Sequence, residues 1–378
     1  MSDQPARRAD LRIDLGAIRH NVEVLSQRAD GARTMVIVKS DGYGHGAPAV
    51  ARAALSAGAD SIGAASLQEA LQLRAAGIDA PLLCWLYSRD DDFGPALDAG
   101  IELSASSKAV LHRIAGTAAE RGVVARVHLK IDTGLCRSGC PADLWPELVE
   151  EAAKLRADGQ VEVVAVWSHL ACADELDHPS IDQQAARFQR AYEQARAVGL
   201  DPIRHLANSA AVLTRPDLHF ELVRPGIAVY GLDPVPQHGD HGLVPAMTFR
   251  SSVALTKRVV AGESVSYGHS WTADRPVNLA LVPVGYADGV PRTLSGRMSV
   301  WLGGRRRPVV GRVCMDQLVV LCDDDEVAEG DEVVLFGPGD RGEPTAAEWA
   351  DEIGTIHYEI VTGMYRPRVT RTVVGEAS

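Results

Sequence analysis

Short apolar runs alternate with longer segments of helical pattern from residue 17 to about residue 230. Helices are predicted where apolar residues recur every three to four positions, as at Ile18, Val22 and Leu25. They are expected at residues 17–29, 47–59, 66–77, 107–122, 143–159 and 180–199. Strands are expected for the apolar runs between them, at residues 35–38, 61–65, 81–86, 124–132, 161–170, 202–207 and 221–231. Ser66 and Glu69 have the spacing of a capping box.

This alternation predicts an α/β fold. Roughly eight βα units within ~200–250 residues favour a (β/α)8 barrel of the TIM type. A doubly wound open sheet is the alternative, and periodicity alone does not separate the two folds. The Gly-rich phosphate fingerprint that such a sheet carries after its first strand is missing here.

The pattern changes near residue 235, where "PVPQHGDHGLVP" indicates a crossing between domains. Beyond it, β-type runs separated by turns predict a mostly β C-terminal domain. They lie at residues 247–260, 277–286, 297–302, 307–313, 317–322, 331–336 and 368–374, with one helical stretch at 345–354. We therefore expect a barrel over residues 15–238 and a β domain over residues 239–378.

Composition narrows the class of protein. The formal net charge of −12 argues against a nucleic-acid partner, and no apolar run approaches the roughly 20 residues that span a bilayer. The basic run at 303–308 is interpreted as a solvated hairpin tip, and the acidic runs at 90–92 and 323–325 as exposed turns.

The N-terminus has no apolar core of a signal peptide, so we expect a cytoplasmic protein with reduced cysteines. Cys136 with Cys140, or His169 with Cys172, could bind a metal, but neither pair has a second pair at zinc-site spacing. Ordinary packing is therefore favoured, and no metal is expected.

Lys39 ends the predicted strand at 35–38, and the glycines of "SDGYGHG" follow it directly. Polar residues at the C-terminal ends of barrel strands lie at the mouth where ligands bind. Lys39 is therefore either a structural lysine or a Schiff-base lysine made nucleophilic by desolvation. The glycines would let the backbone approach a ligand closely, with Tyr43 in the same space.

Other predicted strand ends also carry polar side chains, each of which taken singly is more often structural. A set of cations at successive strand ends suits an anionic ligand such as a phosphate or carboxylate. The residues concerned are Lys130, Arg137, His169, Asn208, Ser209 and Arg224.

The string "VKSDGYGHG" resembles the pyridoxal-phosphate signature of alanine racemases. "LKIDTGLCRSG", "WSHLACADE", "NSAA", "VRPGIAVYGLDP", "VSYGHSW", "VPVGYADG", "GRVCMDQLVV" and "HYEIVTG" resemble further blocks of that family, in its order. The resemblance implies a barrel followed by a β domain, with residues 1–14 pairing onto the latter. It also implies an alanine racemase that supplies D-alanine for bacterial peptidoglycan, built as a head-to-tail homodimer whose active sites are shared between subunits.

The resemblance further implies the site residues. Lys39 would hold pyridoxal 5'-phosphate as an aldimine, Arg224 would face the pyridine nitrogen, and His169 would connect Arg224 to Tyr267. Arg137 would bind the substrate carboxylate, with Lys130, which this family can carbamylate, in support. The remaining cofactor-binding positions are Tyr43, Asn208, Ser209, Gly226, Ile227 and Tyr358; Tyr267, Tyr286, Met315 and the supporting Asp316 belong to the β domain.

The implied chemistry needs two bases, because a proton leaves one face of the α-carbon and another arrives on the opposite face. Lys39 would serve the D-alanine side and Tyr267 the L-alanine side.

Three other classes of protein would account for part of this pattern. A non-enzymatic pyridoxal-phosphate carrier would match the first domain only, and a barrel-type decarboxylase would carry an acid towards the pyridine nitrogen and a glycine-rich phosphate loop. A Schiff-base aldolase would explain Lys39 but not the tyrosine of the β domain.

Overall fold

The computed structural model describes residues 8–375, which divide into two compact units. The barrel unit consists of residues 18–42 and 46–243, and the β unit of residues 8–17, 43–45 and 244–375. Of the segment 1–14 that was expected to pair with the second domain, residues 1–7 lie outside the described residues.

The barrel unit contains, within residues 18–243, an eight-stranded parallel sheet in the order β8-β7-β6-β5-β4-β3-β2-β9. Its strands are β2 (Arg33–Ile37), β3 (Ser61–Ser66), β4 (Leu82–Leu86), β5 (Glu102–Ala105), β6 (Ala125–Lys130), β7 (Val161–Trp167), β8 (Ile203–His205) and β9 (Leu222–Val223). Beyond the ends of β9 and β8, the Arg224 N–H donates to the Ala207 carbonyl at 2.9 Å and brings the two edges together. The predicted barrel is confirmed, because the strands follow one another in chain order without the reversal of a doubly wound sheet.

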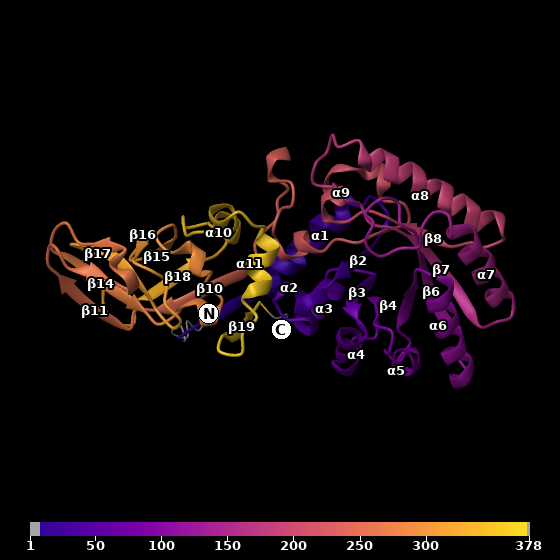
Figure 1. Ribbon diagram of the computed structural model, residues 1–378, viewed down its shortest axis with the longest axis horizontal. Helices are drawn as coiled ribbons and strands as arrows, with labels where there is room; N and C mark the ends of the chain where they lie inside the picture. Colours follow the sequence, from indigo (N-terminus) through magenta and orange to yellow (C-terminus); the bar gives the residue numbers. More distant parts are fainter. Residues whose placement is uncertain (1–7, 376–378) are drawn as a thin grey trace. The chain divides into compact units, whose positions relative to one another are not determined.

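Helices lie outside these strands (Figure 1). They are α1 (Leu15–Arg28), α3 (Ala47–Ser56), α4 (Leu67–Ala75), α5 (Gly94–Asp98), α6 (Lys108–Arg121), α7 (Trp145–Ala157), α8 (Ser180–Ala197) and α9 (Ser209–Thr214). The capping box of Ser66 and Glu69 is present at the start of α4, as predicted. The sequence pattern did not indicate β5 or α5, which are only four and five residues long. No helix among residues 8–375 is long and apolar enough to cross a membrane.

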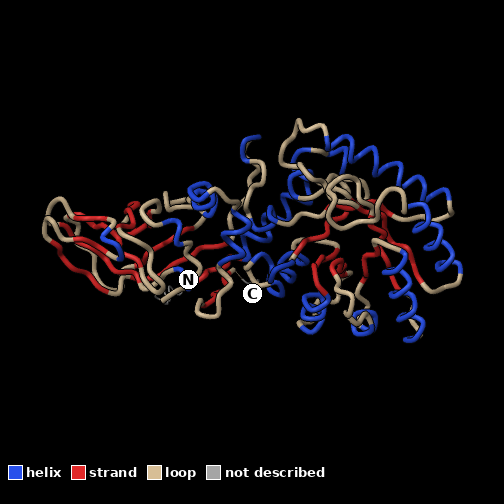
Figure 2. Tube along the Cα trace, viewed as in Figure 1, coloured by secondary structure: helices blue, strands red, loops and turns tan. Residues whose placement is uncertain are grey.

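The β unit contains, among the described residues, a nine-stranded sheet in the order β11-β14-β17-β16-β15-β18-β10-β1-β19 (Figure 2). Its strands are β1 (Asp10–Asp14), β10 (Met247–Ser252), β11 (Leu255–Val259), β14 (Val277–Val282), β15 (Ser299–Leu302), β16 (Arg305–Val310), β17 (Leu318–Asp323), β18 (Glu332–Phe336) and β19 (Thr370–Val374). A separate hairpin pairs β12 (Ser264–Val265) with β13 (Trp271–Thr272). Helix α10 (Ala346–Ile353) was predicted, whereas α11 (His357–Gly363) was not.

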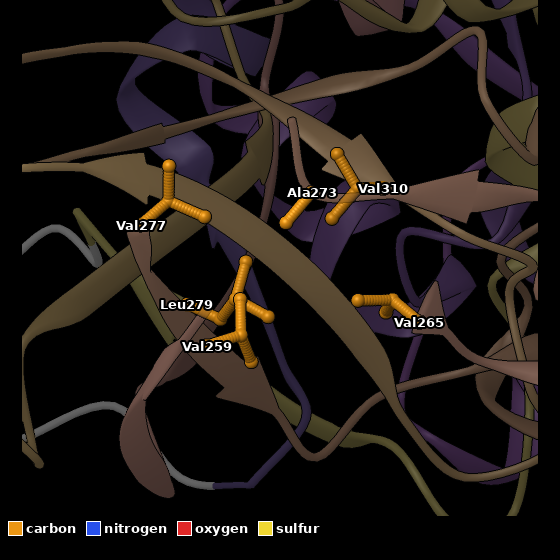
Figure 3. Close-up of a cluster of buried hydrophobic side chains, with 6 residues drawn as sticks. All are labelled: Val259, Val265, Ala273, Val277, Leu279 and Val310. Atoms are coloured by element: carbon orange, nitrogen blue, oxygen red, sulfur yellow. The ribbon is translucent and has the colours of Figure 1, made fainter. Parts of the chain in front are cut away.

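Apolar side chains at one end of this unit form a compact core beside the hairpin (Figure 3). The cluster consists of Val259, Val265, Ala273, Val277, Leu279 and Val310. Strands β11 and β14 each contribute to it, and Val265 comes from β12. Strands β12 and β13 lie on either side of Tyr267, so buried apolar contacts anchor the hairpin around this tyrosine to the main sheet.

A buried carboxylate joins three strands that are distant in sequence. Asp10 on β1 is 1% exposed and accepts hydrogen bonds from Arg250 Nε at 2.8 Å and Thr372 Oγ1 at 2.7 Å. Strand β1 pairs with β10 in the antiparallel sense and with β19 in the parallel sense. The N-terminal strand is thus inserted between two strands from the C-terminal part of the chain.

The basic run at 303–308 is not simply a solvated hairpin tip. Arg305 and Arg307 both bind Asp325, and Arg307 is only 3% exposed. Because β16 and β17 are antiparallel neighbours, they bring the basic run against the acidic run at 323–325. The two runs neutralise each other, which the sequence order alone did not indicate.

Candidate active site

Lys39 follows β2 and opens a turn of left-handed backbone, α2 (Lys39–Tyr43). Ser40 and Asp41 have φ angles of 54° and 52°, and Gly42 has a φ of 62°. Left-handed backbone costs a non-glycine residue roughly 1–2 kcal/mol, so the surroundings must hold this turn in place.

Side-chain oxygens supply that support. Ser40 N–H donates to Glu69 Oε1 at 2.5 Å, and Ala47 N–H donates to Asp41 Oδ1 at 2.9 Å. The second oxygen of Glu69 accepts the N–H groups of residues 65 and 66 at the start of α4. The capping-box acid of α4 therefore also fixes the backbone directly behind Lys39.

Lys39 has a lowered pKa. Burial lowers it first and the charge of Arg137 lowers it further, while Glu69 acts in the opposite direction. A lowered pKa enlarges the fraction of neutral amine, which is the nucleophilic form. Lys39 is therefore suited to form a Schiff base and to take up a proton.

Lys130 ends β6 and lies in the same group of cations. Its Nζ donates to Ser138 Oγ at 2.8 Å and lies 4.1 Å from the centre of the Trp167 ring. Burial lowers the pKa of Lys130 to about 7, with the charges of Arg224 and Arg137 adding to the effect. Near pH 7, the neutral form of Lys130 is therefore far more populated than that of an ordinary lysine.

Arg224 follows β9 and is 5% exposed. Its Nη2 donates to the Ser168 carbonyl at 2.7 Å and lies 3.4 Å from His169 Nδ1. Since arginine can only donate, His169 Nδ1 is the acceptor in this contact. Burial, together with the Arg224 charge, holds the pKa of His169 well below its ordinary value. His169 is neutral at physiological pH.

Two helical starts meet near Ser209. Asn208 caps α9, its Oδ1 accepting the Ala211 N–H at 3.1 Å. Ser209 Oγ accepts the N–H groups of Gly226 at 2.8 Å and Ala228 at 3.3 Å, at the beginning of the 3₁₀ turn Ile227–Tyr230. Backbone N–H groups gathered at helical starts favour an anion such as a phosphate.

The β unit carries the other candidate residues. Tyr43 is buried, and its ring centre lies 6.2 Å from that of Tyr358 in the first turn of α11. The Tyr286 N–H donates to the carbonyl of residue 314 at 3.0 Å, which places Tyr286 next to the Met315 segment. Asp316 binds Arg368 at 2.6 Å.

Three of these β-unit residues are exposed although they are large and apolar or aromatic. Tyr267 is 72% exposed, Met315 52% and Tyr286 39%. The segments that carry them are tied together, because Ser266 Oγ donates to the Arg312 carbonyl at 2.7 Å. The three side chains thus belong to neighbouring loops of the β unit and are available to a partner.

The structure adds residues that the motifs did not single out. Trp167 lies beneath both Lys130 and Arg224, with the Arg224 guanidinium 4.9 Å from its ring centre. His205 stacks on Trp167 at 5.4 Å between ring centres and accepts from Arg224 at 3.0 Å. Their positions at the ends of β7 and β8 were the only sequence signal that could have identified them.

The strand ends of this closed parallel barrel carry a lysine of lowered pKa, further cations and N–H groups that favour an anion. Together they define an enzyme that uses a lysine on an anionic ligand. Residues 13–234 match the family described as "Alanine racemase, N-terminal domain", and residues 246–373 match "Alanine racemase, C-terminal domain". The chain therefore belongs to the alanine racemase family.

Individual relatives agree over nearly the whole chain. An alanine racemase of Mycobacterium avium is 53% identical over 371 residues, covering 97% of this chain and 95% of that protein. The crystal structure of the alanine racemase of a D-cycloserine-producing Streptomyces lavendulae has a TM-score of 0.96 and 47% identity, covering 99% of each chain. That of Bartonella henselae, which carries covalently bound pyridoxal phosphate, has a TM-score of 0.86 and 28% identity, covering 97% and 99%.

Proposed function

We propose that this chain interconverts L-alanine and D-alanine with pyridoxal 5'-phosphate by a two-base mechanism, in the cytoplasm. Membership of the alanine racemase family supports the activity and the cofactor, and the product D-alanine serves bacterial cell-wall peptidoglycan. The observation that carries the assignment is the group of basic side chains around Lys39, in which Lys39 itself has a lowered pKa.

The residues present fit the cofactor. Lys39 offers an amine for the covalent link. The Ser209 hydroxyl, whose oxygen accepts the N–H groups of Gly226 and Ala228, would donate its own proton to the phosphate, with Gly226 and Ile227 beside it. Arg224 would offer only N–H donors to the ring nitrogen and would so keep it unprotonated. When bound, the cofactor withdraws electrons from the substrate and makes its Cα–H bond acidic.

Two side chains move the proton at the substrate α-carbon. Lys39 removes it from D-alanine, and Tyr267 removes it from L-alanine on the opposite face. The neutral form of Lys39 is favoured by burial and by neighbouring cations, as a base requires. His169 accepts from Arg224 and so presents an uncharged imidazole towards the tyrosine side of the site.

The substrate carboxylate is bound by Arg137 and by the backbone N–H of Met315, with Tyr286 beside it and Asp316 in support. Lys130 would steady Arg137 in its carbamylated form. Because its pKa is about 7, Lys130 holds much of its amine in the neutral form that combines with carbon dioxide. Carbamylation would convert this cation into an anion, which suits the neighbouring Arg137.

The active sites are shared between two subunits arranged head to tail. Tyr267, Tyr286 and Met315 are exposed on the β unit, and each completes the barrel site of the partner subunit. Exposure of three large side chains on tied loops favours a contact that buries them.

Borohydride reduction tests the cofactor link. Protein reconstituted with pyridoxal phosphate should show a visible absorbance band, and reduction should fix the cofactor on the peptide that contains Lys39. Lys39→Ala should lose the band and racemisation in both directions, whereas replacement of the exposed Lys257 on β11 by alanine should lose neither. A reconstituted wild-type protein without the band, or a label on another lysine, would overturn the assignment.

A further inference from the structure

Four buried side chains form a continuous row of hydrogen bonds inside the barrel. Arg224 Nη1 donates to His205 Nδ1 at 3.0 Å, His205 Nε2 meets His128 Nδ1 at 2.9 Å, and His128 Nε2 meets Glu102 Oε2 at 2.8 Å. Glu102 lies on β5, His128 on β6 and His205 on β8. Their exposed fractions range from 0% for His205 to 5% for Glu102 and Arg224.

The two ends of the row fix the direction of every hydrogen bond in it. A guanidinium can only donate and a carboxylate can only accept. His205 must therefore accept at Nδ1 and donate from Nε2, and His128 must do the same. A proton on either Nδ1 would place two N–H groups against each other. Both imidazoles are consequently neutral and carry their proton on Nε2.

Charges along the row agree with this direction. Burial alone would raise the pKa of Glu102, but the hydrogen bonds from His128 and Arg126 bring it to about 2. Burial holds the pKa of His205 well below its ordinary value, and the Arg224 charge adds to the effect. Glu102 is therefore an anion, Arg224 is a cation, and His205, which accepts from Arg224, is uncharged.

We propose that Glu102 and His128 are positioning residues of the racemase, which act through His205 to hold Arg224 as a fixed, charged donor facing the ring nitrogen of the cofactor. The proposal rests on the proposed function, since that function assigns Arg224 to the ring nitrogen. A buried cation needs a counter-charge. Glu102 provides it from two imidazoles away, so that no acid lies beside the ring to protonate its nitrogen.

Trp167 supports the same arrangement. Its ring stacks on His205 with an interplanar angle of 16°, and its Nε1 donates to Ser104 Oγ at 3.0 Å. Stacking prevents the His205 ring from turning over, which would exchange Nδ1 and Nε2. The row thus has one geometry as well as one direction.

Glu102 and Glu162 offer a matched pair of variants. Both carboxylates bind Arg126, at 2.9 Å and 2.8 Å, but Glu162 is exposed and has no contact with His128 in this row. Glu102→Gln removes the counter-charge from the row and keeps the side-chain shape. Glu162→Gln removes a carboxylate from the same arginine and leaves the row intact.

The first measurement needs neither a Glu102 variant nor the cofactor. In protein labelled with ¹⁵N-histidine, nitrogen chemical shifts report the protonation of each ring, and single-histidine replacements assign them. From the hydrogen-bond directions we expect a neutral His205 ring with its proton on Nε2, and no proton on Nδ1 of His128. A charged ring, or a proton on Nδ1 of His205, would overturn the proposal even if Glu102→Gln failed to fold.

The second measurement uses the enzyme loaded with pyridoxal phosphate. Glu102→Gln should shift the downfield N–H proton resonance of His128, lower kcat about tenfold with little change in KM, and add absorbance at long wavelength when alanine is present. Glu162→Gln should match the wild type in all three. Identical behaviour of the two variants would refute the role proposed for Glu102 but not the proposed function. A wild-type protein that neither binds the cofactor nor racemises alanine would refute the proposed function itself.

Discussion

Lys39→Ala and Tyr267→Phe proteins should each be nearly inactive, yet a mixture of the two should regain activity when their subunits exchange. The reason lies in the position of the two bases. Lys39 belongs to the barrel unit, whereas Tyr267 lies in the β unit with 72% of its surface exposed. If the partner subunit's Tyr267 completes the site around Lys39, a heterodimer has one site with both defects and one site with none.

The size of the recovery follows from counting sites. Random exchange of equal amounts makes about half of the dimers heterodimers, and each of these has one intact site of two. Activity should therefore approach about one quarter of the wild-type value at equal protein concentration. If both bases came from one chain, each site of the heterodimer would keep one defect and activity would stay near zero.

The assay must establish both exchange and activity. Native mass spectrometry of differently tagged subunits measures the heterodimer fraction, and chiral chromatography measures D-alanine formed from L-alanine. Lys39→Ala mixed with Arg137→Ala is the matched control, because both residues lie in the barrel unit and every site of that heterodimer has one defect. Heterodimers that are present but inactive, or equal recovery in the control mixture, would refute the shared-site arrangement while leaving the cofactor assignment intact.

Three further changes test separate parts of the structure. Arg224→Glu should protonate the ring nitrogen and add transamination, seen as pyruvate among the products; unchanged product composition would contradict the role of Arg224. The second change concerns Lys130 in the apoprotein, in buffer free of carbon dioxide. Its pKa is about 7 in the folded state, so above pH 7 the folded protein has lost a proton that the unfolded protein still binds. The free energy of unfolding should therefore rise by about 1.4 kcal/mol per pH unit above pH 7. Lys130→Met should remove that slope in urea titrations at pH 7 and pH 9. Asp10→Asn should cost about 2 kcal/mol, because a neutral amide replaces the buried carboxylate that binds Arg250 and Thr372 and Arg250 keeps only Glu332 as a charged partner. An unchanged urea midpoint would show that the link between β1, β10 and β19 is not important for stability.

Hydrophobic periodicity was sufficient for most of the fold. The long helices α6 and α8 and the apolar strands β6 and β7 each contain enough residues for a period to be recognised. Strand β5 has four residues and α11 has seven, which is too short for a repeating pattern to stand out. The pairing of Arg307 with Asp325 was missed for another reason, since it depends on which strands are neighbours and not on either run alone.

The residues of the candidate site also fall into those that the sequence could indicate and those that it could not. Lys39, Lys130 and Arg224 end or follow barrel strands, and a polar residue at that position is a signal in the sequence. Glu102 and His128 lie within strands, where a buried polar side chain has no distinguishing pattern until its partners are known. Strands β5 to β8 are consecutive in the sheet, so their common face brings Glu102, His128 and His205 together, and closure between β8 and β9 adds Arg224 to the row.

The charges of the site explain how the same group of cations can lower the pKa of Lys39 and favour an anionic ligand. Arg137 and Arg224 lower the pKa of Lys130, and Arg137 does the same for Lys39, because each positive charge disfavours the next. The same repulsion is relieved when an anionic ligand enters, so that phosphate and carboxylate groups bind where the cations are crowded. Glu102 lies outside this group of cations, since His128 and His205 separate it from Arg224. It can therefore compensate the charge of the buried Arg224 without itself accepting from the Arg224 N–H groups.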